Sequence, residues 1–224
     1  MFSFQLISTL ASAALLVSAT STHRGGNCDT SKSVLDLPTT QTTLIVPSTA
    51  PLFVTLGVGV QNYSCTSTTS AYTSIGAVAS LFDISCLAET PEFATIQATA
   101  SIIWKNAPPS VKAHTIGRHI LTPSLLGDHY FVTSGTGLAA KWDFTSFGRF
   151  AGNTTAFVIA AKVGDLPAPT GPAANVDWLA LNNVQGALAS KVFRIDTVGG
   201  QPPTSCVPGS DPISVKYTAK YLFY

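Results

Sequence analysis

The chain has 224 residues, of which 46% are hydrophobic and only 10% charged, and its formal net charge is +1. A nucleic-acid-binding protein needs a basic stripe to offset the phosphate charge, so this balance argues against nucleic acid as a partner. A disordered chain is less apolar than this one. We therefore expect one folded domain with a full hydrophobic core.

The N-terminal region reads as a targeting segment. An apolar run within residues 1–19 is too short to span a bilayer and closes at Ala19 among small residues, which predicts a signal peptide cleaved after Ala19. No Lys or Arg precedes Arg24, so the usual positive start is missing, and a buried helix or a membrane anchor is the alternative. No later segment has about 18 consecutive apolar residues, as a spanning helix needs. We predict a secreted, extracellular β-rich domain over 20–224, with no membrane attachment after cleavage.

Two segments of the mature chain alternate between apolar and other residues, as strands with one buried face do. The first covers 52–61, where Gly57 and Gly59 on the second face predict close packing against a neighbour or a bend. The second covers 72–86. A short strand is also predicted at 44–46.

The pattern then changes to that of a helix. Pro91 suits the first helical position and Glu92 favours the N-terminal end of the helix dipole. Apolar residues follow at helical spacing, namely Phe93, Ile96, Ala100 and Ile103. A second short helix is predicted at 110–121, so we expect a small helical insertion at about 90–122.

The rest of the chain returns to strands. Segments 128–134 and 138–147 flank a glycine turn, and 156–163 is a continuous apolar run of strand length. Residues 176–206 read as a hairpin, and 213–224 alternates cleanly. The residues expected to face inward on that last strand are Ile213, Val215, Tyr217, Ala219, Tyr221 and Phe223. The predicted fold class is mainly β, an antiparallel β-sandwich or barrel.

Four cysteines remain after the predicted cleavage: Cys28, Cys65, Cys86 and Cys206. An even count in a secreted chain predicts two disulfides, and spacing alone leaves three pairings open. No two of them form a CxxC pair, which argues against a zinc ribbon or a thioredoxin-like site.

Two sequons predict glycosylation, at Asn62 and Asn153. Both lie beside turn-like residues, and Asn153, which follows a glycine, is the better candidate. Asn62 continues the apolar face of its strand, so the strand must end or bulge there if Asn62 carries a glycan.

Some motifs resemble catalytic or cofactor-binding signatures, but the residues around them do not fit those functions. Gly135, Gly137 and Ala140 match G-x-G-x-x-A, but this dinucleotide fingerprint requires a strand before it and a helix after it, and here a hairpin turn is the better interpretation. His114 and His119 are five apart rather than four, so they do not form a helical metal pair. We therefore predict no cofactor, no metal site and no catalytic residues.

The chain also carries segments that are specific to one family. They include GVGVQNYSC at 57–65, FVIAAKVGDLPAPTGP at 157–172 and VDWLALN at 176–182. On these segments the chain resembles the fungal secreted family known as domain of unknown function 3455. Members are often named malate dehydrogenase. The sequence of this chain predicts no Rossmann unit, so its residues do not support that activity. The resemblance implies a β-rich extracellular fold and no established activity.

The resemblance also implies a disulfide pairing. Bacterial relatives keep a Tyr-x-Cys and a Gly-Gly-x-x-Pro…Cys segment, matched here by Tyr63 with Cys65 and by 199–206. This favours Cys65–Cys206 and leaves Cys28–Cys86.

A candidate binding site follows from the same comparison. The His-Tyr and Trp…Asp region of the family is matched by His129, Tyr130, Trp142 and Asp143.

Two functions follow as hypotheses. The first is a non-enzymatic glycoprotein that acts at the cell surface, the cell wall or the host interface. It would bind cell-wall polysaccharide or a host protein there, and a virulence effector is one protein of this kind. The alternative is a secreted hydrolase or metal-dependent enzyme that acts on an extracellular polymer through His129 and nearby acids, because aspartates at strand ends can form carboxylate pairs.

Overall fold

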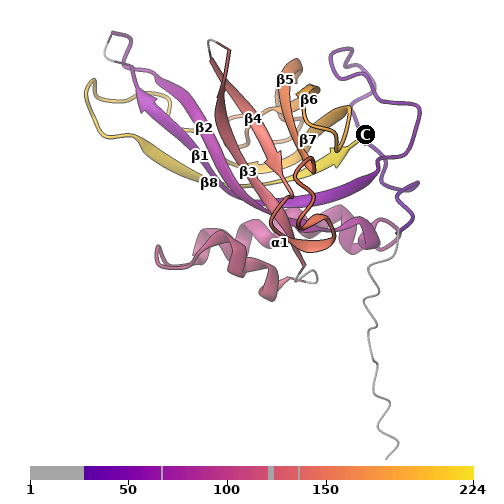
Figure 1. The fold of residues 1–224 in the computed structure, drawn as a ribbon. Helices are drawn as coiled ribbons and strands as arrows, with labels where there is room; N and C mark the ends of the chain where they lie inside the picture. The colour runs from indigo at the N-terminus through magenta and orange to yellow at the C-terminus, as the bar shows by residue number, and fades with distance from the viewer. Residues whose placement is uncertain (1–27, 67, 121–123, 136) are drawn as a thin grey trace, which may run out of the picture.

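Eight antiparallel strands close into a barrel in the computed structural model, which describes residues 28–66, 68–120, 124–135 and 137–224 (Figure 1). Each strand pairs with the next along the chain, and β8 pairs with β1 to close the ring. The strands are β1 Phe53–Cys65, β2 Tyr72–Asp83, β3 Leu125–Ser134, β4 Gly137–Asp143, β5 Phe157–Leu166, β6 Trp178–Gln185, β7 Lys191–Gly199 and β8 Ile213–Phe223. The predicted β-rich class is confirmed as a barrel, and the predicted signal peptide at 1–19 lies outside the described residues.

The β1–β8 seam shows how the sequence sets the two faces of the sheet. Side chains alternate between the interior and the outside, and Tyr217 and Tyr221 of β8 point inward as predicted. A Cβ atom added to Gly57 of β1 would lie only 2.5 Å from the Tyr221 ring. The close packing predicted at this glycine is therefore confirmed, since only glycine admits the tyrosine ring there.

A helical layer covers the outside of β1 and β8 (Figure 1). It consists of α1 Glu92–Asn106 and the 3₁₀ helix η2 Ala113–His119, which confirms the predicted insertion. The buried face of α1 presents Ile96, Ala100 and Trp104, four residues apart. Trp104 Nε1 donates to the Gly59 carbonyl oxygen at 2.7 Å, so the helix is held by a hydrogen bond as well as by burial.

Two lysines of β8 lie on the outer face of the sheet, where the helix covers them. Lys216 Nζ donates to the main-chain oxygens of Trp104 and Ala107, each at 2.8 Å, at the C-terminal end of α1 where a cation is favoured. Lys220 is 2% exposed and forms an ion pair with Asp196 at 2.8 Å. The outward face of β8 is therefore an interface to the helix rather than a solvated surface.

One end of the barrel is filled by aromatic rings. Phe53 stacks on Phe223 with ring centroids 4.5 Å apart, and Phe144 packs edge-on against both at 5.3 Å. All three rings are at most 2% exposed. Two short 3₁₀ helices follow strands that end here, η1 Ser85–Leu87 after β2 and η3 Gly148–Phe150 after β4.

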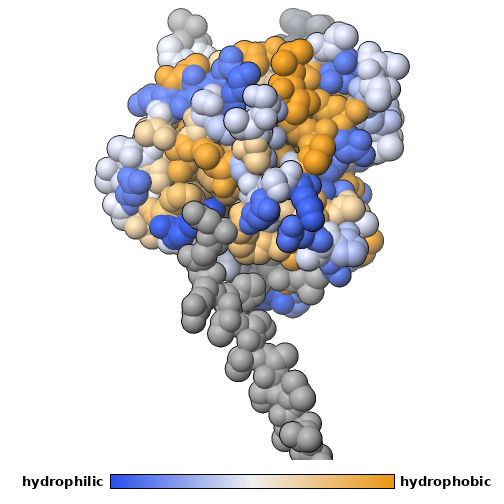
Figure 2. All heavy atoms as spheres, turned by 90° about the vertical axis from the view of Figure 1, so that its right-hand side faces the viewer, coloured by the Kyte–Doolittle hydropathy of each residue, from blue (hydrophilic) through white to orange (hydrophobic). Residues whose placement is uncertain are grey.

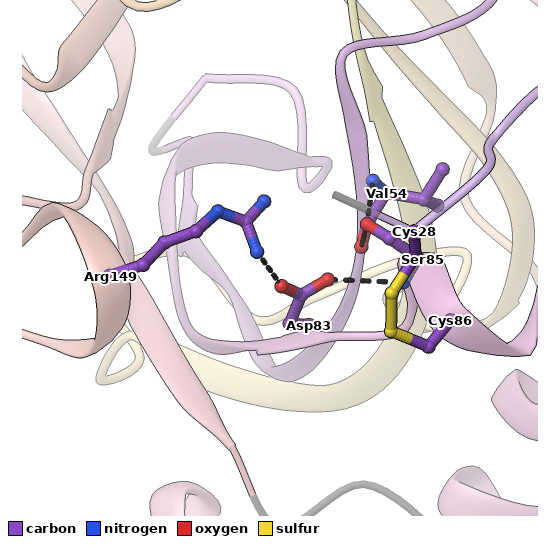
Figure 3. Close-up of a disulfide and its surroundings, with 6 residues drawn as sticks. All are labelled: Cys28, Val54, Asp83, Ser85, Cys86 and Arg149. Atoms are coloured by element: carbon purple, nitrogen blue, oxygen red, sulfur yellow. Dashed lines mark hydrogen bonds and ion pairs between the residues drawn. A yellow bond between two sulfur atoms is a disulfide. The ribbon is translucent and has the colours of Figure 1, made fainter. Parts of the chain in front are cut away.

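Polar and covalent contacts secure this closed end (Figure 3). The Asp83 carboxylate accepts a hydrogen bond from Arg149 and, through Oδ1, from the Ser85 N–H at 3.0 Å. The Arg149 guanidinium also lies over the Phe53 ring, 5.3 Å from its centroid. Beside this cluster, a disulfide joins Cys28 of the N-terminal segment to the chain after β2.

Both disulfides implied by the family resemblance are present. They are Cys28–Cys86 and Cys65–Cys206, and no cysteine among the described residues is free. The second joins the end of β1 to the segment between β7 and β8, across 141 residues of sequence. A cross-link over so long a loop removes much of the entropy of the unfolded chain.

The local predictions were mostly confirmed. Gly135 and Gly137 lie in the hairpin between β3 and β4, where Gly135 has φ +60°, so the G-x-G-x-x-A match is a turn. The predicted hairpin within 176–206 is present as the pair β6–β7. The short strand predicted at 44–46 was wrong, because this segment pairs with no strand and Leu44 instead packs against Gly164.

Figure 2 views the molecule from the right-hand side of Figure 1 and shows hydrophobic areas interrupted by hydrophilic residues. Among the described residues, no helix is both long and apolar enough to cross a membrane.

Candidate binding site inside the barrel

A cavity of about 700 Å³ occupies the barrel at the end away from the phenylalanine cluster. Side chains from all eight strands line it. It reaches the surface, since Leu138 and Lys162 in its wall are exposed. An eight-stranded barrel is just wide enough either to be filled by its own side chains or to hold one small ligand.

Most of the cavity wall is apolar, and much of it is built from small residues. The apolar lining consists of Phe131, Leu138, Ala139, Ala140, Ala160, Ala161, Val176, Leu179, Leu181 and Val184. The alanines of β4 and β5 leave space that larger side chains would fill. A cavity of this volume, mainly apolar with a few placed polar groups, is typical of a small-molecule site.

His129 and Trp142 lie side by side in this wall. They are direct partners in the β3–β4 register, and their rings stack with centroids 4.6 Å apart. His129 Nδ1 donates to the Lys141 carbonyl oxygen at 2.9 Å, which leaves Nε2 as an acceptor. Burial lowers the pKa of His129 to about 4, so the ring is neutral at neutral pH.

Arg194 brings the principal charge into the cavity. It points inward from β7, opposite Tyr221 of β8 in the register. Its Nε and Nη2 atoms both donate to the main-chain oxygen of Asp177, at 3.0 and 2.8 Å. The Tyr221 hydroxyl in turn lies 2.8 Å from that of Tyr217, and burial raises the pKa of both tyrosines, which keeps them neutral.

Two acids and a lysine stand further out on the wall. Lys162 and Asp165, both on β5, form an ion pair at 2.5 Å. Burial raises the pKa of Asp177, and the nearby Asp165 carboxylate raises it further. Asp177 and Asp165 therefore repel each other, and Lys162 offsets part of that charge.

The structure divides the four predicted site residues between two faces of the sheet. His129 and Trp142 line the cavity, whereas Tyr130 and Asp143 project from the outer face of the same two strands. The Tyr130 hydroxyl donates to Asp143 Oδ2 at 2.7 Å, and Lys141 Nζ lies 2.8 Å from the same oxygen. His129 and Asp143 therefore share no cleft.

The residues around Asp143 on the outer face also determine its charge. Partial burial acts to raise the pKa of Asp143, but hydrogen bonds from Lys141, Thr145 and Tyr130 outweigh it and hold the pKa well below its usual range. Asp143 is thus an ionised partner in a surface network, with no contact to the cavity lining.

Residues 47–224 match the model of a family described as "Protein of unknown function (DUF3455)". The chain belongs to this family. The match covers all eight strands of the DUF3455 barrel and therefore every residue of the cavity. No curated protein and no solved structure matches the chain.

Sequence reasoning missed the polar residues deeper in the DUF3455 barrel. Gln61, Arg194 and Tyr221 line the cavity but stand in strands predicted only as structural. The alternation of β7 gave no signal for Arg194, because it puts the apolar Phe193 and Ile195 on one face and Arg194 on the other, with Asp196.

The predicted sequons differ in their surroundings. Asn153 is exposed in the turn before β5, where its side-chain oxygen accepts from the Thr155 N–H at 3.0 Å. Asn62 lies within β1, beside a register shift at Asn62/Tyr63, and accepts from Ser214 Oγ at 2.7 Å. Glycosylation of either residue stays a prediction. Among the described residues, no group of three or more His, Cys, Asp or Glu side chains is placed to hold a metal ion.

Proposed function

We propose that this DUF3455 protein is an extracellular, non-enzymatic binding protein that holds a small, largely apolar molecule inside its barrel. The observation that carries the proposal is the 700 Å³ cavity, with its apolar wall and a few inward polar side chains. Sites for small molecules are concave, mostly apolar and largely preformed, and this cavity has all three properties.

The extracellular setting is part of the proposal. Two disulfides support it, because disulfides persist in oxidising compartments and are rare in the cytosol. The exposed Asn153 turn supports glycosylation. We keep the cell surface, the cell wall or a host interface as the place where the protein acts. The bound species that we propose is a small molecule in the barrel rather than a polymer.

Titration with a neutral apolar fluorophore, N-phenyl-1-naphthylamine, tests this function. The wild-type protein should bind it saturably, with the fluorescence rise of an apolar environment. Ala160→Phe places a ring in the cavity and should weaken binding at least about tenfold, since the ligand and the new side chain compete for one space. Leu179→Trp, on β6, is a second filling variant.

Ala173→Phe is the matched control, because Ala173 lies in an exposed loop outside the cavity. It should bind as the wild type does. Circular dichroism and the melting temperature show that each variant is folded. The absence of saturable binding to the wild type, or unchanged binding to folded Ala160→Phe and Leu179→Trp, would refute the proposed function.

A further inference from the structure

The charge of Arg194 has no carboxylate partner within the described part of the chain. Its hydrogen bonds go to a main-chain oxygen of Asp177, and it takes part in none of the ion pairs. A guanidinium has five N–H donors, so these two bonds leave others free. A cation inside a barrel is costly unless an anion accompanies it, so the interior favours a ligand that carries one.

Arg194 forms no ion pair with the described groups around it. Its charge acts on His129, whose ring is neutral, on Tyr63, Tyr217 and Tyr221, whose pKa values are raised by burial, and on Asp177, whose pKa it lowers. The charged groups that face the same space are Asp177, Asp165 and Lys162. Lys162 pairs with Asp165, and no Asp177 carboxylate oxygen lies within ion-pair distance of the guanidinium.

The wall next to Arg194 offers further donors. Gln61 Nε2 and Trp142 Nε1 are buried cavity-lining atoms with no hydrogen-bond partner among the described residues. Their side chains are 5% and 1% exposed. A buried donor left without an acceptor destabilises the site, and a ligand that supplies acceptors removes that cost.

The free groups beside Arg194 are mostly donors. Arg194, Gln61 and Trp142 donate, whereas Nε2 of neutral His129 accepts. One further buried acceptor without a hydrogen-bond partner among the described residues, Asp165 Oδ1, lines the cavity, but it belongs to the carboxylate that pairs with Lys162. A carboxylate is an acceptor-only group that can take two parallel bonds from a guanidinium. An alcohol or a primary amide brings donors of its own, which this wall satisfies less well.

On the basis of the proposed function, we propose that the ligand is a monocarboxylic acid with an apolar body, whose carboxylate binds Arg194 with Gln61 and Trp142 as further donors. Arg194 takes part in no ion pair among the described residues, so one carboxylate on the ligand would supply its partner. The apolar lining of β4, β5 and β6 holds the body of the acid.

Calorimetric titration with two ligands of equal chain length, dodecanoic acid and dodecan-1-ol, tests this assignment at pH 8 and below their micellar concentrations. In the wild type the acid should bind at least about tenfold more tightly than the alcohol, as a charge-assisted bond predicts. Arg194→Gln should remove that preference and leave the affinity for the alcohol within about twofold. Lys112→Gln removes an exposed cation that does not line the cavity and should leave the preference unchanged.

Two more variants keep the test informative if Arg194→Gln does not fold. Arg194→Lys retains the charge and should keep the preference for the acid, whereas Trp142→Phe keeps the stacked ring, loses the Nε1 donor and should weaken the acid more than the alcohol. Equal binding of the two ligands to the wild type, or a preference that survives in a folded Arg194→Gln, would overturn the carboxylate assignment while the small-molecule site stands. Binding of neither ligand overturns it as well, and if N-phenyl-1-naphthylamine also fails to bind, the proposed function fails with it.

Discussion

The two ends of the barrel are built by the same strands but are filled differently. Phe144, which directly follows β4, and Trp142 of β4 place large side chains on the inner face, whereas Ala140 of β4 places a small one there. The closed end holds stacked phenylalanines that are at most 2% exposed, whereas the other end holds a cavity of about 700 Å³. Strand number fixes the width of the barrel, so side-chain size decides which end is packed and which is hollow.

This difference separates stability from binding. Closely packed rings at the closed end contribute most of their burial energy to folding. The hollow end gives up part of that energy and exposes polar groups to a ligand, as functional sites commonly do. Truncation should therefore be costly at the closed end and mild at the open end.

Phe144→Ala tests the closed end and has the largest expected effect. Removing this fully buried ring should lower the free energy of unfolding by about 3–5 kcal/mol, because the rings around it cannot collapse into the space. Leu179→Ala is the matched change at the open end, where it only widens an existing cavity, and should cost about 1–2 kcal/mol. Urea unfolding measures both, and equal losses would show that the two ends are equally packed.

Much of the fold could be predicted from the sequence because its signals are local. Alternation on β1 and β8, the helix start at Glu92 and the glycine turn at Gly135 each depend on neighbours along the chain. Closure into a barrel depends on the pairing of β1 with β8, about 160 residues apart, which alternation does not specify. The sequence therefore predicted a sandwich or a barrel without deciding between them.

The candidate site was predicted only in part for a related reason. The segment 129–143 was predicted as a binding site and contributes His129 and Trp142 to the cavity wall, but sequence proximity does not show which face of a sheet a residue occupies. His129 and Asp143 are 14 positions apart across a hairpin, and the register places them on opposite faces. Arg194 and Gln61 come from distant strands, so only closure of the barrel brings them near His129.

The pH dependence of stability tests the open end, with the second-largest effect. His129 has a pKa of about 4 when folded against an ordinary value of 6.5, so the unfolded chain binds its proton more readily. Its neutral form contributes stability above pH 6.5, and this is lost as the pH falls from 6.5 towards 4. The expected loss from this group is about 3 kcal/mol.

His129→Asn isolates that contribution, because asparagine keeps a donor for the Lys141 carbonyl but does not titrate. Its free energy of unfolding should fall less than that of the wild type between pH 7 and pH 4. Ala173→Asn, at an exposed loop position where neither residue titrates, is the control and should follow the wild-type curve. Parallel curves for the wild type and His129→Asn would mean that the pKa of His129 is the same in the folded and the unfolded protein.

Asp143→Asn tests the outer face and has the smallest expected effect. Loss of the charge weakens the bonds from Lys141 and Tyr130, which should lower the free energy of unfolding by about 1–2 kcal/mol. Because Asp143 does not line the cavity, the affinity for an apolar ligand should stay within about twofold of the wild type. Asp211→Asn, in the exposed segment before β8, is the control and should leave the free energy of unfolding close to that of the wild type. If Asp143→Asn abolished binding while the protein stayed folded, the outer face would belong to the site. The separation of the four predicted residues between the two faces of the sheet would then have no functional meaning.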